Sequence, residues 1–425
     1  MKRFLSILFI IACCTISFTI YAKSNSSFNS ENILKLDGKW ELTGISPDGS
    51  RTIKVVGTVP GQVHPDLISA GIIPDPFWRK QAEQCQWVED WEWRYKKIFS
   101  LPEHFSGKWL MLQFDGLDTY ASIYLNGKLL SQTNDMFIPY EFNISKGWLK
   151  SGANEIEVRF APAVKTVAGK PRNKYSAVFD TSASRVYIRR MQCTFGWDWV
   201  NRFVTAGIWR SCRIVAYQDS RIDDIFAYTS ELNSEKANLK IQVTASSVNQ
   251  LNGKLKLLIT NQDGQTVWQK TSDVNKSLIN FEAQINLPQI WWPNGAGKQP
   301  LYYITAVLYD KQDKEIHRKT IETGIRTVTI EELPDKDKKG SSFTIVMNGE
   351  RIFAKGGNWV PADPFPARIT KEKYNRVLDQ AMDAGMNILR SWGGGIYEPE
   401  AFWHACNKMG IMVTQDFLLA CASYP

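Results

Sequence analysis

The sequence predicts a multidomain protein in which two successive β-sandwiches are followed by alternating strands and helices. Short segments of alternating apolar and polar residues recur between turn residues from 34 to 218, and again from 221 to 329. After an Asp/Lys-rich stretch at 334–340 the pattern changes to strand, helix, strand. The chain has 425 residues, of which 44% are apolar. That is enough for about two to four domains.

Residues 1–22 are predicted to be a secretion signal. Two basic residues precede an apolar run over 4–20, and Ala22 offers a small residue at a cleavage point. The sequence Ile-Ile-Ala-Cys at 10–13 also resembles a lipoprotein box, so lipid anchoring stays an alternative. No later stretch approaches the roughly 18 apolar residues that a spanning helix needs. We therefore expect a secreted or periplasmic protein with no transmembrane segment after signal cleavage.

Residues 34–218 are predicted to form the first sandwich. The sequence Trp-Glu-Trp-Arg-Tyr at 91–95 alternates aromatic and charged residues, as a strand with one buried face should. The span is long for an immunoglobulin-type sandwich and favours a larger, jelly-roll-like one. The expected strands share alternation and flanking turn residues, and they lie at 39–42, 91–99, 108–114, 121–125, 155–160 and 208–217.

Residues 219–332 are predicted to form an immunoglobulin-like sandwich. Their length of about 110 residues suits a module of seven strands. Between two strands, the sequence Trp-Trp-Pro-Asn-Gly at 291–295 marks a turn. Its tryptophans could stack on sugar, but we interpret them as packing at a domain junction. The expected strands include 239–244, 255–259, 279–285 and 302–309.

Residues 341–425 are predicted to begin a parallel sheet with helical crossovers. Thr370 can cap a helix that Gly385 ends, and Pro399 suits the first turn of a second helix that Gly410 ends. The order βαβαβ fits either an open doubly wound sheet or a (β/α)8 barrel, and the local pattern leaves both open. A complete barrel takes about 250 residues, so these residues would form less than half of one.

Polar and aromatic side chains stand at the predicted carboxyl ends of these strands. Strand one ends at Asn358 and Trp359, strand two at Arg390 and Trp392, and strand three at Asp416. In α/β barrels such positions face the active site. Alternatively, Arg390 and Asp416 only pair with each other, and Trp359 only closes the core.

A second cluster lies in the first predicted sandwich, where Trp197 and Trp199 flank Asp198. Indole faces suit the C–H edges of a sugar, and a carboxylate suits its hydroxyls. The alternative is a loop whose indoles pack inside the sandwich while Asp198 caps a turn.

Composition and cysteine spacing exclude several classes of function. The net charge of +8 is mild and no Arg-rich run appears, so we expect no nucleic-acid partner. Five cysteines follow the leader without a C-x-x-C pair, beside only four histidines, so we expect no metal and no cofactor. We interpret the cysteines as buried free thiols. If one bridge forms, Cys193 and Cys212 are the expected pair, because they flank a candidate hairpin.

Ordered motifs over 34–425 resemble the β-mannosidases of glycoside hydrolase family 2. They are Val-Pro-Gly-Gln-Val-His at 59–64, Trp-Val-Glu-Asp-Trp-Glu-Trp-Arg at 87–94, Phe-Gly-Trp-Asp-Trp at 195–199, Ala-Gly-Ile-Trp-Arg at 206–210, Trp-Trp-Pro-Asn-Gly at 291–295, Gly-Asn-Trp-Val-Pro-Ala-Asp at 357–363, Leu-Arg-Ser-Trp-Gly-Gly-Gly at 389–395 and Gln-Asp-Phe at 415–417.

The resemblance implies a jelly-roll sugar-binding domain, an immunoglobulin-like domain and the first three βα units of a (β/α)8 TIM barrel. It also implies a binding site for β-mannoside oligosaccharides. By the family pattern, Trp197 and Asp198 reach over the barrel to the terminal sugar, and Trp392 is a wall of the same pocket. The remaining residues that the pattern places in or just behind this pocket are Asn358, Arg390 and Asp416.

The implied chemistry is retaining hydrolysis of terminal β-D-mannose by two glutamates roughly 5 Å apart. In the family, the acid/base follows strand four in an Asn-Glu pair and the nucleophile ends strand seven. Neither strand is expected among these residues. The glutamates Glu372, Glu398 and Glu400 lie in or beside predicted helices and do not replace the pair. We therefore assign no catalytic residue and expect the 425 residues alone to be inactive.

Two departures from the family pattern adjoin the expected site. Val200-Asn201 stands where Gly-Pro is usual, and Thr414 stands where a tryptophan usually precedes Gln415. Two alternatives therefore stay open. The protein could be another exo-glycosidase of the family, a β-glucosaminidase or β-galactosidase, or it could be a non-catalytic carbohydrate-binding remnant.

Overall fold

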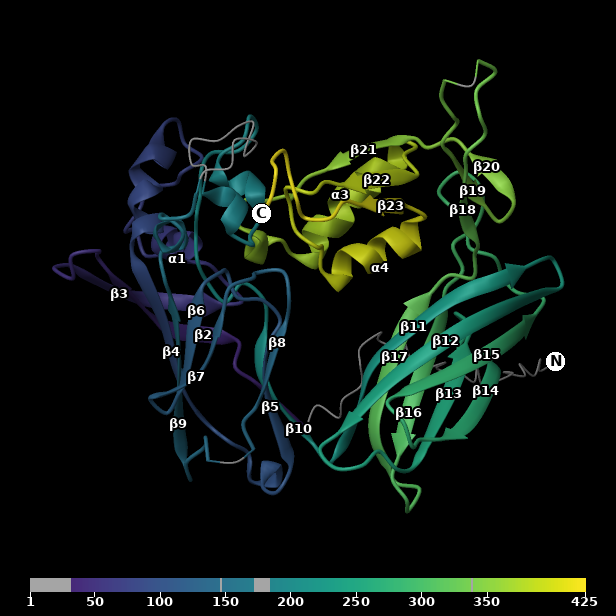
Figure 1. Ribbon diagram of the computed structural model, residues 1–425, viewed down its shortest axis with the longest axis horizontal. Helices are drawn as coiled ribbons and strands as arrows, with labels where there is room; N and C mark the ends of the chain where they lie inside the picture. Colours follow the sequence, from purple (N-terminus) through teal and green to yellow (C-terminus); the bar gives the residue numbers. More distant parts are fainter. Residues whose placement is uncertain (1–31, 146, 172–183, 338) are drawn as a thin grey trace, which may run out of the picture.

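The computed structural model describes residues 32–145, 147–171, 184–337 and 339–425. The predicted signal sequence, 1–22, lies outside the described residues. Two β-sandwiches stand beside each other, and a segment of alternating strands and helices, residues 356–425, lies at the top of Figure 1 between them. The two sandwiches confirm the β-rich part of the predicted fold.

The first sandwich consists of a six-stranded and a four-stranded antiparallel sheet, with the orders β3-β2-β4-β9-β6-β7 and β1-β10-β5-β8. Strand β4 buries Trp93 and Tyr95 while Arg94 between them stays half-buried, as its alternation predicts. The strands are β1 (Ile33–Lys35), β2 (Gly38–Ile45), β3 (Thr52–Val59), β4 (Glu92–Ser100), β5 (Trp109–Phe114), β6 (Ala121–Leu125), β7 (Lys128–Thr133), β8 (Tyr140–Asn143), β9 (Ala153–Phe160) and β10 (Cys212–Tyr217).

The second sandwich consists of a three-stranded sheet, β11-β12-β15, and a four-stranded sheet, β14-β13-β16-β17. Strand β15 buries every second residue, which is the pattern of a strand with one face in the core. The strands are β11 (Ser220–Leu232), β12 (Lys236–Ser247), β13 (Lys254–Thr260), β14 (Thr266–Asp273), β15 (Leu278–Asn286), β16 (Tyr302–Tyr309) and β17 (Glu315–Thr323).

One predicted strand was wrong at its start. The strand expected at 208–217 begins only at Cys212. The indole Nε1 of Trp209 instead donates to the Met136 carbonyl at 3.0 Å, and Arg210 donates to the carbonyl of Tyr397. Residues 208–211 therefore leave the sheet and reach toward residues 356–425.

The stretch 334–340, interpreted as an interdomain linker, is the tip of a hairpin instead. Strands β18 (Val328–Glu331) and β19 (Thr344–Met347) on either side of it pair antiparallel, and β20 (Glu350–Ile352) completes a small sheet. Figure 1 shows this hairpin projecting beside the second sandwich. The domain limits at 218, 332 and 341 remain predictions.

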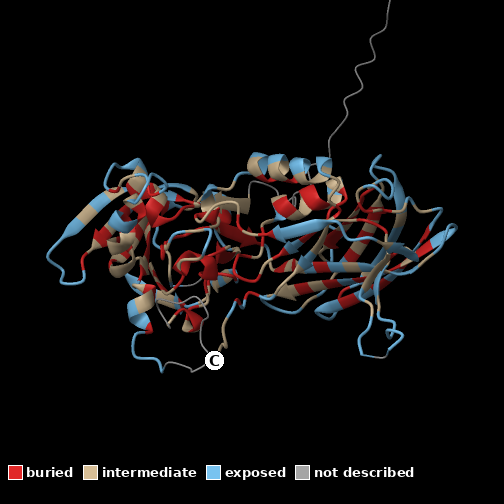
Figure 2. Ribbon diagram, turned by 90° about the horizontal axis from the view of Figure 1, so that it is seen from above, coloured by how far each residue is buried: buried red, intermediate tan, exposed pale blue. Residues whose placement is uncertain are grey.

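The strand–helix segment, residues 356–425, contains three parallel strands and two helices. Strand β22 (Ile388–Ser391) pairs with both β21 (Gly356–Trp359) and β23 (Met412–Gln415). The helices are α3 (Lys371–Asp383) and α4 (Glu400–Met409). Figure 2 shows buried and exposed faces along these helices.

The predicted ends of these helices are confirmed. The hydroxyl of Thr370 accepts a hydrogen bond from the Lys373 amide at 3.2 Å, and Gly385 follows the end of α3. Helix α4 begins one residue after Pro399 and is followed by Gly410. The φ of Gly410, 76°, lies in the left-handed region that glycine adopts without a steric penalty. The order βαβαβ is therefore as expected.

The first sandwich also contains short helices. None of them contains a predicted site residue, although Trp197 and Asp198 follow closely after η5. These helices are α1 (Val63–Ser69), α2 (Ala163–Thr166), η2 (Gln81–Asp90), η3 (Glu103–Phe105), η4 (Arg185–Tyr187) and η5 (Gln192–Phe195), with η6 (Pro366–Arg368) before α3. Across the described ranges, no helix combines the length and apolar character needed to pass through a membrane.

The interpretation of the cysteines as free thiols is confirmed, the alternative Cys193–Cys212 bridge is wrong, and Cys421 is exposed where burial was expected. All five described cysteines are free, and Cys193 and Cys212 are both completely buried. Cys212 lies in the core of the first sandwich, whereas Cys193 packs in another cluster with Met136 and Trp209. Desolvation raises the pKa of the Cys193 thiol to about 12, so it behaves as a small apolar side chain.

Candidate functional site

The loop that carries Trp197 and Asp198 leaves the first sandwich after η5. Gly196, with a φ of 101°, turns the chain, and the Trp197 amide donates to the Val200 carbonyl at 2.9 Å. This tight turn holds Asp198 and Trp199 exposed. The alternative interpretation required the indoles to pack inside the sandwich, and they do not.

The exposed turn meets Trp392 at the end of β22. The ring centroids of Trp197 and Trp392 are 5.0 Å apart at 68°, and those of Trp199 and Trp392 are 6.0 Å apart at 70°. These edge-on contacts join a loop of the first sandwich to the strand–helix segment. Two predicted site residues nearly 200 positions apart in the chain are thus in contact.

The other three predicted residues lie together at the carboxyl ends of the parallel strands. Arg390 donates to both carboxylate oxygens of Asp416 at 3.1 and 2.5 Å, and to the Asn358 side-chain carbonyl at 3.1 Å. The Gly393 amide also donates to Asp416, at 3.2 Å. Both Asn358 and Arg390 are exposed. The Arg390–Asp416 pairing that we considered as an alternative does occur, and it sits where a ligand can reach it.

Trp359, by contrast, belongs to the core. It is 7% exposed and packs on Tyr374 and Phe402. Its indole Nε1 donates to the Glu398 carboxylate at 2.8 Å, and the Tyr374 hydroxyl donates to the same carboxylate. Burial raises the pKa of Glu398. This buried cluster packs on Trp359 and so holds the end of β21 in place from the core side.

Three arginines before the tryptophan loop were missed from the sequence. Buried Arg185 donates to the carbonyls of Ala420 and Cys421, both at 3.0 Å, and its guanidinium lies 5.5 Å from the Trp197 ring centre. Arg189 donates to the Leu418 carbonyl at 3.3 Å. The sequence signal was the Arg189-Arg190 pair just upstream of the motif.

Arg190 is the third arginine, and it forms an ion pair with Asp118 at 2.9 Å. Both side chains are at most 1% exposed. The pair lies inside the first sandwich, below the tryptophan loop. It is therefore a structural support and has no route to a ligand.

An aromatic socket also joins the first sandwich to the strand–helix segment. Phe365 is fully buried, with its ring centre 5.4 Å from that of His64 and 5.2 Å from that of Phe203. The socket and the arginine contacts together form the first junction.

The second junction joins the second sandwich to the opposite end of the strand–helix segment, as the packing interpretation of 291–295 predicted. Trp291 is 4% exposed, and its Nε1 donates to the Asn407 carbonyl of α4 at 2.7 Å. The Asn294 side chain donates to the carbonyls of Met382 and Met386 beyond α3, at 3.1 and 2.9 Å. One turn thus satisfies carbonyls near the ends of both helices.

Nothing in the described part of the chain resembles a metal site, since no group of three or more His, Cys, Asp or Glu side chains is placed to hold an ion. The polar groups at the strand ends are one guanidinium, which donates hydrogen bonds, one carboxylate, which accepts them, and one amide, which can do both. Such a set suits hydroxyl groups of a neutral ligand.

Family models of the glycosyl hydrolases match both sandwiches. Residues 40–210 match the galactose-binding domain-like domain of glycosyl hydrolase 2, and residues 220–326 match glycosyl hydrolases family 2. The chain belongs to glycosyl hydrolase family 2.

The curated relatives of this chain include β-mannosidases. β-Mannosidase B of Thermothelomyces thermophilus is 32% identical over 92% of this chain and 46% of its own length. The β-mannosidase of Capra hircus is 33% identical over 96% of this chain and 47% of its own length. The chain therefore spans about half the length of these relatives.

Solved structures agree with the fold. The β-D-mannosidase of Dictyoglomus thermophilum is 37% identical, with a TM-score of 0.85 over 92% of this chain and 48% of that protein. A β-glucuronidase of Bifidobacterium dentium is 19% identical, with a TM-score of 0.66 over 90% of this chain and 61% of that protein. The latter likeness concerns the fold alone.

Proposed function

We propose that the protein is a retaining exo-β-mannosidase that removes terminal β-D-mannose from oligosaccharides. The observation that carries the proposal is the contact of Trp197 and Trp199 with Trp392, beside the exposed Asp198 carboxylate. The faces of indole rings suit the C–H faces of a pyranose, and a carboxylate accepts its hydroxyls. The similarity to proteins named as β-mannosidases supports mannose as the sugar.

The same proposal covers the finer architecture and the location. The first sandwich is a jelly roll, the second is immunoglobulin-like, and residues 356–425 contribute the first three βα units of a (β/α)8 barrel. The βαβαβ order and the parallel pairing of β21, β22 and β23 over their full lengths support the barrel. The leader at 1–22 supports export to the periplasm or beyond.

In this proposal, each of the six predicted residues has a role in binding. Asp198 accepts sugar hydroxyls, and Trp197 and Trp392 form apolar walls. Arg390, held by Asp416, and Asn358 offer a charged donor and an amide to further hydroxyls. The two glutamates implied by the family chemistry are not among these residues.

Hydrolysis of aryl β-mannoside by the protein in its natural length tests this function. We expect Asp198→Ala to lower kcat/KM by about 10- to 100-fold, because a charge-assisted hydrogen bond to the sugar is lost. Asp263→Ala, in an exposed turn of the second sandwich, is the matched control and should keep full activity. Equal activity of both variants would remove Asp198 from the site. Residues 1–425 alone should show no turnover.

A second candidate is another exo-glycosidase of the family. Val200-Asn201 lies next to Trp199 in place of the usual Gly-Pro, so the loop that shapes the sugar pocket differs at two positions. Comparison of aryl mannoside, galactoside and glucosaminide distinguishes the candidates. A higher kcat/KM for galactoside or glucosaminide than for mannoside would favour the second.

A further inference from the structure

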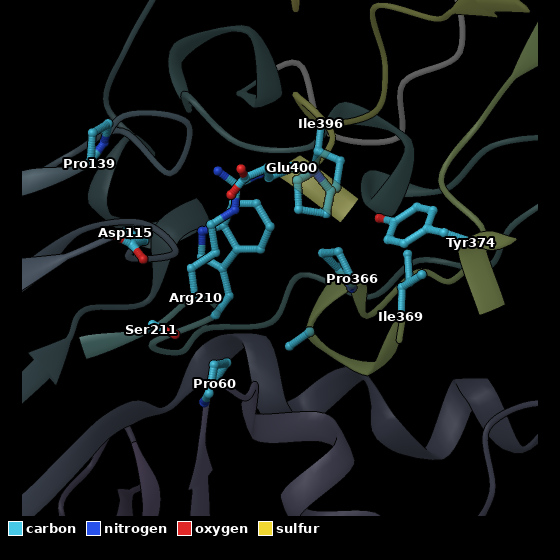
Figure 3. A pocket seen from close by; sticks show the side chains of 13 residues that line it. Pro60, Asp115, Pro139, Arg210, Ser211, Pro366, Ile369, Tyr374, Ile396 and Glu400 are labelled. Carbon is cyan, nitrogen blue, oxygen red and sulfur yellow. The ribbon is translucent and has the colours of Figure 1, made fainter. Parts of the chain in front are cut away.

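A separate cavity of about 530 Å³ lies between the first sandwich and the strand–helix segment. Trp209 and Arg210 line it from the sandwich, and Tyr374 and Ile396 line it from the other side (Figure 3). None of the six residues proposed to bind mannoside lines it. Cavities of this size at domain junctions are typical binding sites for small molecules.

Arg210 is the group in this cavity with unused hydrogen-bonding capacity. Its guanidinium lies 4.2 Å from the Trp209 ring centre and donates to the Tyr397 carbonyl. A guanidinium carries five N–H donors, and no other hydrogen bond or ion pair joins Arg210 to the described residues. Burial lowers the pKa of Arg210, which reflects the cost of a charge removed from water.

Three carboxylates lie near Arg210, and none forms an ion pair with it within the described chain. Glu398 acts on Arg210 through its charge but accepts its hydrogen bonds from Trp359 and Tyr374. Asp115 also lines the cavity, but Arg213 holds both its carboxylate oxygens at 2.7 and 2.8 Å. Glu400, at the start of α4, is exposed and forms no ion pair with the described chain. Water therefore screens the charge of Glu400 more than that of Arg210. Arg210 and Glu400 both line the cavity without an ion-pair partner among the described residues, and Arg210 is the more buried of the two.

The other walls are mainly apolar and rigid. Ile369 and Ile396 lie across from Arg210, and prolines border the cavity on both sides, as Figure 3 shows for Pro60 and Pro366. Such walls suit the body of a small organic molecule and not a hydrated inorganic ion. A planar guanidinium binds a carboxylate through two parallel hydrogen bonds.

We propose that this cavity binds a small organic carboxylate, whose carboxylate group pairs with Arg210 and whose body packs on Ile369 and Ile396. This cavity is separate from the proposed mannoside site, so binding of a carboxylate here does not depend on whether the mannoside site is catalytic. A bound carboxylate would bridge the first sandwich and the strand–helix segment, because its contacts come from both.

Calorimetric titration of the purified protein tests the proposal with D-glucuronate and benzoate as probes. Their uncharged counterparts, D-glucose and benzamide, are the controls. We expect at least one acid to bind, its counterpart not to bind, and added salt to weaken the binding. Binding of neither acid, or equal binding of acid and counterpart, would overturn the proposal. So would inorganic phosphate that binds more tightly than both acids.

Two variants assign the binding to this cavity. Arg210→Lys keeps the charge but loses the planar fork, and it should weaken binding about tenfold. Glu400→Gln removes an exposed negative charge that repels a bound carboxylate, and it should strengthen binding. Arg318→Lys, in the second sandwich, is the control and should change nothing. Weaker binding by Glu400→Gln would mean that Glu400 accepts hydroxyls of a neutral ligand, which contradicts the proposal even if Arg210→Lys folds poorly.

Discussion

The strand–helix segment is held at its two ends by junctions of different chemistry. At the first junction, buried aromatic rings and arginines of the first sandwich contact the strand ends, as in the Phe365 socket and the Arg185 bonds to Ala420 and Cys421. At the second junction, one turn of the second sandwich satisfies carbonyls near the helix ends through Trp291 and Asn294.

The difference separates recognition from support. Near the first junction, exposed Asp198 follows half-buried Trp197, and half-buried Arg210 lies against buried Trp209. The second junction uses its polar groups on backbone carbonyls in the last turns of α3 and α4 and just after α3. Two tryptophan-rich loops of similar composition thus serve opposite ends of the same segment.

The largest effect is expected from the buried ion pair below the first junction. Arg190→Met leaves the Asp118 carboxylate buried without a counter-charge and should cost about 3–5 kcal/mol of unfolding free energy. Urea unfolding followed by circular dichroism measures the midpoint. Arg189→Met, which breaks the more exposed Arg189–Asp135 pair, should cost about 1 kcal/mol or less. Equal midpoints for both variants would show that the buried pair does not support the junction.

The second prediction concerns acid sensitivity of the first junction. Desolvation, and then the charge of Arg190, lower the pKa of His64 from 6.5 to about 3. Below pH 6.5 the unfolded chain therefore binds a proton at His64, whereas His64 in the folded chain stays neutral down to about pH 3. Above pH 6.5 this group costs no stability. As pH decreases below 6.5 the free energy of unfolding falls, by about 3 kcal/mol at pH 4.

His64→Phe should remove this loss while preserving the stack on Phe365. Unfolding at a series of pH values is the measurement. Asp66→Asn is the control of opposite sign, because burial raises the pKa of Asp66 from 3.8 to about 6, so its contribution is lost as pH rises through 6. A pH profile of His64→Phe parallel to that of the unchanged protein would contradict the prediction.

The third prediction compares the two tryptophan loops directly. Trp291→Phe loses the bond to the Asn407 carbonyl and part of a buried ring, which should cost about 2 kcal/mol. Trp199→Phe, at a side chain that is 43% exposed, should stay within about 0.5 kcal/mol. Thermal melting of both variants gives the comparison, and a reversed order would refute the division into support and recognition.

The smallest effect is expected at Asn294. Asn294→Ala removes two bonds to the carbonyls of Met382 and Met386 and should cost about 1 kcal/mol. Hydrogen exchange should become faster at the end of α3 and not at the strand ends. Asn249→Ala, at an exposed position of the second sandwich, is the neutral control. Unchanged exchange at α3 would exclude the capping role.

Much of the fold was predictable because periodicity is a local property. Alternation located β6 and β16 with their exact bounds, and Thr370 and Gly410 marked helix ends through their own side chain and backbone. The start of β10 was predicted wrongly, since Trp209 and Arg210 obtain their partners from Met136 and Tyr397, far away in the chain.

The candidate site divides in the same way. Asn358, Arg390 and Asp416 followed from their position at strand ends, and the resemblance joined Trp197, Asp198 and Trp392 to them. Arg185 and Arg210 were missed because their partners are backbone carbonyls, which carry no sequence signal. The Cys193–Cys212 pair was predicted wrongly, since sequence spacing does not show that the two thiols lie in different cores.

The sequence by itself determined the order of the elements and the residues at their ends, because both depend on neighbours within a few positions. The contacts of Trp197 with Trp392 and of Trp291 with α4 form only in the tertiary structure, although the resemblance and the packing interpretation had pointed to both, and the cavity beside Arg210 was found only there. Such contacts join residues more than 100 positions apart. They depend on how two sandwiches and a parallel sheet pack, which no local pattern encodes.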